Sequence, residues 1–487
     1  MNLVLHPRAA PSNCLRVWVG AFGRIEAPGL TWTLDGEPAV PTTLQPLRSV
    51  RDESLVDPRV PRGFTGIYEF QGSIQPGRSY RVGVRARDAG TDTLTVRALP
   101  EQIPGAFDAP FNVLLVSCFH STEDRGGLAG ELVAQMGGDM RPHLTLLLGD
   151  QVYLDLPTLK RYPGNAEHLA EKFEEDYRTN WAGDKGYSRI LRAAPVAATP
   201  DDHEYWNNFP HPAVAIPATY TAGGREAWRR AACAMYQGFQ LARPEGLERA
   251  VELDVHPLSI FMLDSRTYRT EDRSRSVHPT VLNQFREWTR RVADQGLTGA
   301  VVTGQSLFDE PAGWLKARLA DRTLANYGDY GDVVRQLEWL GDQGRPVLCI
   351  TGDVHWGRMM ETRDRRQKAK FYEVISSPTS LVTTIGADQL KAWGSAARGL
   401  LGRSPEPWVR HADPHDPPLF LAHDVLGKRF ACDTPAIHSQ KGNHVTLLSF
   451  NQTGLGLELR VSYWPIFPRG RPAAPTHVRA VRLSPAY

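Results

Sequence analysis

Four clusters of chemically reactive side chains stand in this sequence, each directly after an apolar run. They are Ser117-Cys118-Phe119-His120, Gly149-Asp150 with Tyr153, Asp201-Asp202-His203-Glu204, and Gly352-Asp353-Val354-His355. Together they supply a thiol, a phenol, imidazoles and several carboxylates. So many acids brought together would repel one another and would be costly to remove from water. Bound metal cations resolve this difficulty, and a thiolate and phenolate with an imidazole suit a redox-capable metal such as iron.

Each residue taken alone also has an ordinary structural explanation. Asp150 could cap a helix N-terminus, and Cys118 could be a small buried hydrophobic residue. Tyr153 could be a packed aromatic ring with its hydroxyl at the surface, and His355 a core histidine with its hydrogen bonds satisfied. The runs "DDHE" and "GDVH" are more specific, because consecutive polar residues at the end of an apolar strand do not suit a core.

The elements that must position these residues follow an alternating pattern from about residue 111 onward. Apolar runs, predicted as buried strands, occupy residues 111–118, 143–150, 195–202, 258–266, 299–305 and 345–353. Segments with helical spacing separate most of them, which predicts an α/β layered fold. In open α/β sheets the loops at the carboxyl ends of strands meet at one edge, where ligands bind. We therefore expect the four clusters to converge.

The rest of the chain divides into regions of different character. Residues 1–103 carry short alternating runs rich in Val, Tyr, Trp and Thr, which predict a small β-sandwich domain. Pro100, Pro104 and Pro110 then mark a linker, and residues 111–487 are predicted as a second, α/β domain. Residues 384–440 lack clear periodicity and are expected to form a long insertion near the site or an ordered loop.

Composition excludes several classes of protein. Of the 487 residues 23% are charged, and the net charge of +2 gives no signal for nucleic acid or for an anionic membrane. No run of about 18 apolar residues predicts a transmembrane helix. The five cysteines are scattered and odd in number, unlike a disulfide framework. With no apolar leader or twin arginine at the start, a cytoplasmic location is favoured; a trimmed leader would instead indicate a periplasmic or secreted protein.

The motifs "VSC", "GDQVY", "DDHE", "LDSRTYR", "TGDVH" and "EVISSP", in this order, identify a resemblance to a known family. The chain resembles the PhoD-like (alkaline phosphatase D) branch of the calcineurin-like metallophosphoesterase superfamily. The resemblance spans about residues 112–380. It implies a four-layer α/β/β/α sandwich with a dinuclear metal site at the strand ends. It also implies an immunoglobulin- or fibronectin-like sandwich at the N-terminus.

The resemblance also implies a ligand set for two metal ions. Cys118, Asp150, Tyr153 and His355 would bind Fe³⁺, and Asp150 would bridge to the second ion. Asp202 and Asp353 would bind that second ion, which would be Ca²⁺-like because calcium prefers oxygen ligands. The superfamily has a further His after the strand at residues 299–305, where this chain has Gln305 nearby.

The function implied is metal-dependent hydrolysis of a small phosphate ester, either a monoester or a diester. The metal pair would polarise the phosphorus, and His203 would stabilise charge or protonate the leaving group. Arg266 is a candidate for phosphate contact, with a salt bridge under the sheet edge as an equal alternative. A phospho-ligand binding or scaffold protein without turnover is the second hypothesis. A β-sandwich adhesion protein is the third, but it leaves the strand-end clusters unexplained.

Overall fold

A computed structural model describes the chain from residue 2 to residue 485. The description leaves out residues 53, 55–56, 89, 125, 157–161, 164, 242–247, 308–320, 354, 356, 365–369, 377, 381–429, 432–436, 441, 455, 467–473 and 479. The insertion expected at residues 384–440 therefore lies almost entirely outside the described residues. Among the described residues, no helix is both long and apolar enough to cross a lipid bilayer.

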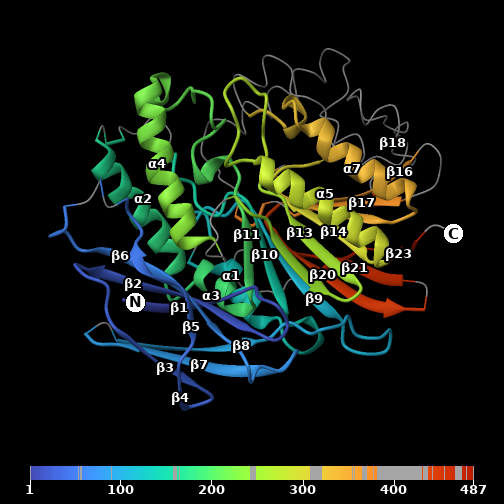
Figure 1. Ribbon diagram of the computed structural model, residues 1–487, viewed down its shortest axis with the longest axis horizontal. Helices are drawn as coiled ribbons and strands as arrows, with labels where there is room; N and C mark the ends of the chain where they lie inside the picture. Colours follow the sequence, from blue (N-terminus) through green and yellow to red (C-terminus); the bar gives the residue numbers. More distant parts are fainter. Residues whose placement is uncertain are drawn as a thin grey trace.

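Two large sheets form the centre of the molecule (Figure 1). Within the described residues the first has eleven strands, and β23 (Val481–Leu483) pairs with β21 beside the main order. That order is β22 (Thr476–His477), β21 (Gly456–Pro465), β20 (His444–Thr453), β9 (Phe111–Val116), β10 (Leu144–Leu148), β11 (Val196–Thr199), β1 (Leu3–Arg8), β2 (Leu15–Arg24), β6 (Arg62–Phe70) and β5 (Thr42–Ser49). The strands β9, β10 and β11 are parallel, as their apolar runs predict.

The second sheet has eight strands among the described residues, with β19 (His438–Gln440) paired to β16 beside the main order. That order is β12 (Val251–Val255), β13 (Leu258–Met262), β14 (Thr298–Thr303), β15 (Val347–Thr351), β17 (Lys370–Ile375), β16 (Gly357–Asp364) and β18 (Phe430–Ala431). The four strands β13, β14, β15 and β17 are parallel.

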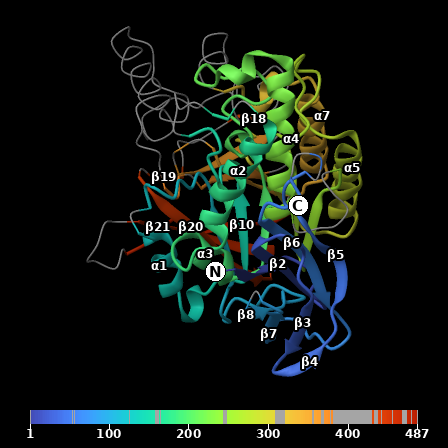
Figure 2. The same cartoon turned by 90° about the vertical axis from the view of Figure 1, so that its left-hand side faces the viewer.

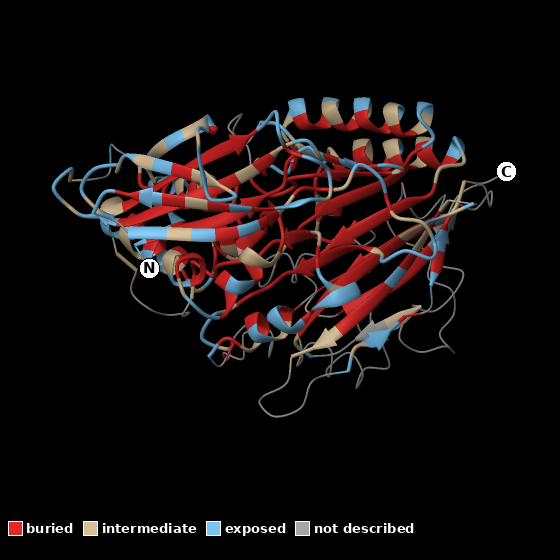
Figure 3. Ribbon diagram, turned by 90° about the horizontal axis from the view of Figure 1, so that it is seen from below, coloured by how far each residue is buried: buried red, intermediate tan, exposed pale blue. Residues whose placement is uncertain are grey.

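Alternate side chains along each central strand divide the interior into layers. In β9, Val113 and Leu115 point toward the second sheet and join one core with Ile260 and Ile350. Leu114 and Val116 of the same strand point outward and belong to another core. This two-residue periodicity places one apolar core between the sheets and one on the outer face of each (Figure 3).

Helices cover both outer faces. On the first sheet lie α1 (Leu128–Gln135), α2 (Ala166–Trp181), α3 (Tyr187–Ala193) and α4 (Ala222–Phe239), and on the second α5 (Pro279–Asp294) and α7 (Tyr330–Asp342). The predicted α/β/β/α sandwich is therefore confirmed. Short 3₁₀ turns complete the connections, namely η2 (Gly138–Met140), η3 (Asp202–Glu204), η4 (Pro217–Tyr220) and η5 (Leu324–Asn326).

The N-terminal strands form a sandwich that continues the first large sheet. The strands β3 (Leu30–Leu34), β4 (Glu37–Ala39), β7 (Ser79–Ala86) and β8 (Gly90–Arg97) make a separate small sheet at one end of the molecule (Figure 2). An apolar core joins this sheet to β1 and β2. Yet β1 also pairs in parallel with β11, and Trp18 of β2 belongs to the same core as α2 and α4. The boundary between residues 1–103 and 111–487 stays a prediction about folding units, because a continuous sheet crosses it.

Glycines allow the strand ends of the two sheets to approach one another closely. A Cβ atom added to Gly352, which follows β15, would overlap the Leu148 carbonyl oxygen and the Ser117 hydroxyl of the first sheet. A Cβ on Gly149 would lie 2.5 Å from Asp201 Cβ, and the φ of Gly149, 84°, is itself left-handed. The loops that carry the reactive residues therefore converge at one edge of the sandwich.

Candidate metal centre

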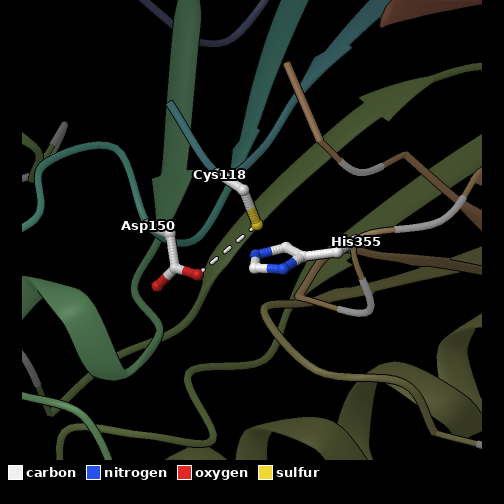
Figure 4. A group of neighbouring side chains, drawn as sticks. All are labelled: Cys118, Asp150 and His355. Carbon is white, nitrogen blue, oxygen red and sulfur yellow. Dashed lines mark hydrogen bonds between the residues drawn. The ribbon is translucent and has the colours of Figure 1, made fainter. Parts of the chain in front are cut away.

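The first group of possible ligands joins residues from both sheets. Cys118 follows β9, Asp150 follows β10, and His355 follows β15, and their ligand atoms lie within 4.8 Å of one another (Figure 4). Cys118 Sγ is 3.4 Å from Asp150 Oδ2. Cys118 and Asp150 are buried, and His355 is partly exposed. A thiolate, a carboxylate and an imidazole in this arrangement can bind one transition-metal ion.

The second group consists of oxygen donors only. The carboxylates of Asp150, Asp201, Asp202 and Asp353 offer oxygen atoms within 4.8 Å of one another. Asp150 belongs to both groups, which is the position that a bridging ligand must occupy. Asp201 was not among the ligands predicted from the sequence, although it lies in the "DDHE" run. A third group joins Asp150 and Asp202 to His203 within the same distance. The predicted Cys, Asp and His ligands therefore all lie in groups that share Asp150.

The backbone at these positions adopts an uncommon conformation. Four predicted ligands have φ values in the left-handed region, which residues other than glycine rarely enter. They are Cys118 at 52°, Asp150 at 56°, Asp353 at 62° and His355 at 56°. Such a conformation costs on the order of 1–3 kcal/mol per residue and is found mostly at functional sites. This backbone strain falls on four predicted ligands, which belong to the two groups described above.

The charges of the second group require compensation. Burial raises the pKa of Asp150 well above its usual value, and the neighbouring acids Asp202, Glu204 and Asp353 raise it further. Burial also raises the pKa values of Asp201 and Asp202. These carboxylates therefore bind either protons or cations. Carboxylate oxygens favour hard divalent ions, so the donor set fits a metal ion at this position.

Glu204, which the sequence analysis did not assign a role, holds the two ligand loops in place. Its fully buried carboxylate accepts hydrogen bonds from the backbone N–H groups of Asp150 (2.8 Å), Gln151 (2.6 Å) and Asp201 (2.8 Å). The side chain of Gln240, directly after α4, donates a further bond of 3.1 Å. Asp201 and Glu204 also form the capping box of η3, a pattern that "DDHE" makes recognisable.

His203 lies beside the shared ligand and is oriented by a carboxylate. Its Nδ1 is 2.7 Å from Asp155 Oδ1, and Asp155 Oδ2 accepts a 2.8 Å bond from the Asn207 backbone. Burial alone would lower the pKa of His203, but Asp155, Asp202 and Asp150 together raise it well above its usual value. The three carboxylates favour the protonated imidazole, and the catalytic role of His203 stays a prediction.

Tyr153 packs against the ring of His203, which lies beside Asp150 and Asp202. The side chain is 6% exposed, and its ring lies 4.3 Å from that of His203 and 5.7 Å from that of His120, between centroids. Coordination by its oxygen stays a prediction.

Arg266 occupies the salt-bridge position rather than an open phosphate site. Its guanidinium is fully buried, with Nε 2.7 Å from Asp201 Oδ1 and Nη2 2.7 Å from Asp321 Oδ2. Nη1 also donates to the Phe209 carbonyl oxygen at 3.3 Å. This geometry matches the alternative that the sequence left open. Arg266 neutralises Asp201 and Asp321, and its contact with substrate stays a prediction.

Gln305 stands where the superfamily's further His was expected, and it positions a ligand. Its Nε2 donates to Asp321 Oδ2 at 2.6 Å and lies 3.3 Å from Asp353 Oδ2. Arg269 donates to Gln305 Oε1 and so fixes the direction of the amide. The amide orients the Asp353 carboxylate. Among the described residues, the imidazole that lies within 4.8 Å of carboxylates in this cluster is that of His203, beside Asp150 and Asp202.

Comparisons with known proteins agree with this geometry. A sequence profile described as PhoD-like phosphatase matches residues 113–414, more than half of the chain, and the chain therefore belongs to this family. The structure is similar to a solved structure of PhoD, with a TM-score of 0.60 at 14% identity, covering 99% of this chain and 90% of that one. It is also similar to a purple acid phosphatase from yellow lupin (Lupinus luteus) seeds. That TM-score is 0.51 at 11% identity, covering 94% of this chain and 71% of the other. A comparison with curated proteins found no significant match.

We predict that Glu204→Gln releases metal faster than the unaltered protein does. A glutamine offers one acceptor oxygen and adds an N–H₂ donor, so it cannot accept all three backbone bonds. Each buried donor left unsatisfied costs about 1–3 kcal/mol, so the free energy of unfolding should fall by about 2 kcal/mol or more. Metal release is measured against a competing chelator, and unfolding by denaturant titration.

The matched control is Glu174→Gln. Glu174 on α2 is also a buried carboxylate, but it bonds Arg51 at 2.5 Å instead of a ligand loop. This control should lose stability and keep the unaltered rate of metal release. Equal release rates in Glu204→Gln and the unaltered protein would show that Glu204 does not hold the ligands.

Proposed function

We propose that the chain is a metal-dependent hydrolase of phosphoric esters, monoesters or diesters, with a dinuclear metal site. The observation that carries this proposal is the position of Asp150 in both ligand groups. Membership in the PhoD-like phosphatase family supports phosphatase chemistry. A small phosphate ester is the corresponding substrate. The alternative is a binding or scaffold protein that binds a phospho-ligand and releases it unchanged. The experiment below distinguishes this alternative from hydrolysis.

The two ligand groups differ in donor chemistry, and this supports different metals. Cys118 and His355 of the first group offer sulfur and nitrogen donors. Tyr153 would add a phenolate, and this donor set suits Fe³⁺. The second group offers carboxylates alone, which suit Ca²⁺ or another hard divalent ion. We therefore propose Fe³⁺ with Ca²⁺ as the resident pair.

Each protein group has a definite task in the proposed reaction. Cations held by the two groups would supply positive charge that polarises the phosphoryl group and acidifies a water molecule. His203, held by Asp155 at Nδ1, keeps a proton beside the shared ligand Asp150 and can donate it to the leaving oxygen. Asp155 fixes the tautomer and direction of the imidazole, and Glu204 fixes the loops on which Asp150 and His203 stand.

The test is a panel of chromogenic esters, 4-nitrophenyl phosphate and bis(4-nitrophenyl) phosphate, offered to protein loaded with iron and calcium. We expect turnover of at least one ester, which a chelator abolishes. Asp150→Asn should lower kcat at least about a hundredfold, because the altered side chain leaves two cations without their shared negative ligand. Asp294→Asn, at the exposed end of α5, is the control and should retain full activity. Stoichiometric metal without turnover of either ester would favour the binding-protein alternative.

The role of Tyr153 has a test of its own. If its phenolate binds Fe³⁺, charge transfer from oxygen to metal should colour the purified protein. Tyr153→Phe keeps the ring and nearly all of the packing but removes the oxygen, so the visible absorbance should vanish and iron retention should weaken. Tyr80→Phe, in the N-terminal sandwich, removes a hydroxyl that bonds Gln75 N at 2.7 Å and should change neither property. Unchanged absorbance and iron content in Tyr153→Phe would remove Tyr153 from the metal site.

A further inference from the structure

Arg322 lies next to the second ligand group. Its Nη1 donates to the Asn208 side-chain oxygen at 2.9 Å, and the Asn208 backbone N–H donates to Asp202 Oδ2 at 2.9 Å. Only one residue therefore separates the guanidinium from a predicted metal ligand. Asn208 has a left-handed φ of 69°, so this connection belongs to the same tightly constrained region as the ligands.

The backbone of Arg322 is fixed from beneath by buried ion pairs. The preceding residue, Asp321, bonds Arg266 through both carboxylate oxygens. Arg269 donates to the Arg322 carbonyl oxygen at 3.0 Å, and the Arg269 guanidinium lies 4.6 Å from the Tyr327 ring centroid. The side chains of Arg266 and Arg269 are themselves buried and hydrogen-bonded within the protein. Arg322, by contrast, is only half-buried.

The guanidinium of Arg322 has donors that the protein does not use. It forms no ion pair with an acid within the described part of the chain, and its buried Nε has no hydrogen-bond partner there. Burial lowers its pKa, and the nearby Arg273 and Arg269 lower it further. The neighbouring His211 is held neutral, because burial and Arg322 lower its pKa to about 4. Asp321 also acts on the charge of Arg322 and raises its pKa, but this carboxylate is bonded to Arg266. A partly desolvated cation that forms no ion pair within the described residues is suited to bind an anion from solution.

We propose that Arg322 is a substrate-binding residue whose guanidinium contacts a non-bridging oxygen of the phosphoryl group held at the second ligand group. The inference rests on the proposed function and gives to Arg322 the role that the sequence offered to Arg266. Arg266 lies beneath the acids with its donors taken, whereas Arg322 lies beside them with donors available. A guanidinium fork matches phosphate oxygens in geometry and in charge.

The test measures binding of inorganic phosphate to the metal-loaded protein by calorimetry. Arg322→Gln keeps an N–H donor that can reach Asn208 but removes the charge. We expect the phosphate dissociation constant to rise about tenfold to a hundredfold, the range for losing a bond between charged groups. Arg322→Lys keeps the charge and should recover part of that loss. In turnover of a phosphate ester, the same substitutions should raise KM more than they lower kcat.

Arg291→Gln is the matched control, and metal content is the second readout. Arg291 stands on the last turn of α5, bonded to Asp254 at 2.7 Å and Glu252 at 2.9 Å. The Arg291→Gln substitution should leave the affinity for phosphate unchanged. Unchanged phosphate affinity in Arg322→Gln would overturn the proposal. If Arg322→Gln lost a bound metal ion as well as phosphate affinity, the proposal would also be overturned. Arg322 would then act on the predicted ligand Asp202 through Asn208. If no ester is hydrolysed, the proposed function fails, but the phosphate titration still decides the role of Arg322.

Discussion

The architecture of the site depends on one buried carboxylate. Glu204 accepts the backbone N–H groups of Asp150, Gln151 and Asp201, which belong to two different strand ends. These three bonds fix the distance between the loops and therefore the separation of the ligands that they carry. Asp150 can belong to both ligand groups only while this distance holds. A buried acceptor with several backbone donors is also costly to disturb, since each donor would be left unsatisfied.

The same carboxylate connects the site to the N-terminal sandwich. Gln240, which donates to Glu204, directly follows α4, and the last carbonyl groups of that helix accept bonds from other elements. Trp18 of β2 donates to the Gly238 carbonyl oxygen at 2.6 Å, and Trp181 of α2 to the Phe239 carbonyl oxygen at 3.1 Å. Arg8 of β1 also donates to the Phe239 carbonyl oxygen. Since β1 pairs with β11, the N-terminal strands support the metal centre both through the sheet and through α4.

The sequence predicted those parts of the site that follow from strand order. Cys118, Asp150, Asp202, Asp353 and His355 each stand directly after, or within a few residues of, an apolar run, and parallel strands bring such positions to one edge. The same alternation of strands and helices predicted an α/β layered fold, and the family resemblance implied its four layers. Tyr153 was predicted as a metal ligand by resemblance alone. Its ring packs against that of His203, and coordination by its oxygen stays a prediction.

What the sequence did not predict depends on partners distant in the chain. Glu204 meets Asp150 and Gln151 from more than fifty positions away, and Arg266 meets Asp201 across sixty-five. No local pattern distinguishes an arginine that binds phosphate from one that neutralises buried acids, so Arg266 and Arg322 could be told apart only by burial and by unused donors. Likewise, the alternating runs of residues 1–103 indicate strands but not the pairing of β1 with β11, which joins the sandwich to the first sheet.

The central claim is that two cations occupy the space around Asp150, one in each ligand group. Elemental analysis by mass spectrometry of protein purified after expression in medium replete with iron and calcium tests it most directly. Our account predicts two metal ions per chain in the unaltered protein, and fewer than one per chain when Asp150 is replaced by Asn. A protein that folds cooperatively yet carries no stoichiometric metal would contradict the account, because the buried carboxylates would then be balanced by protons alone.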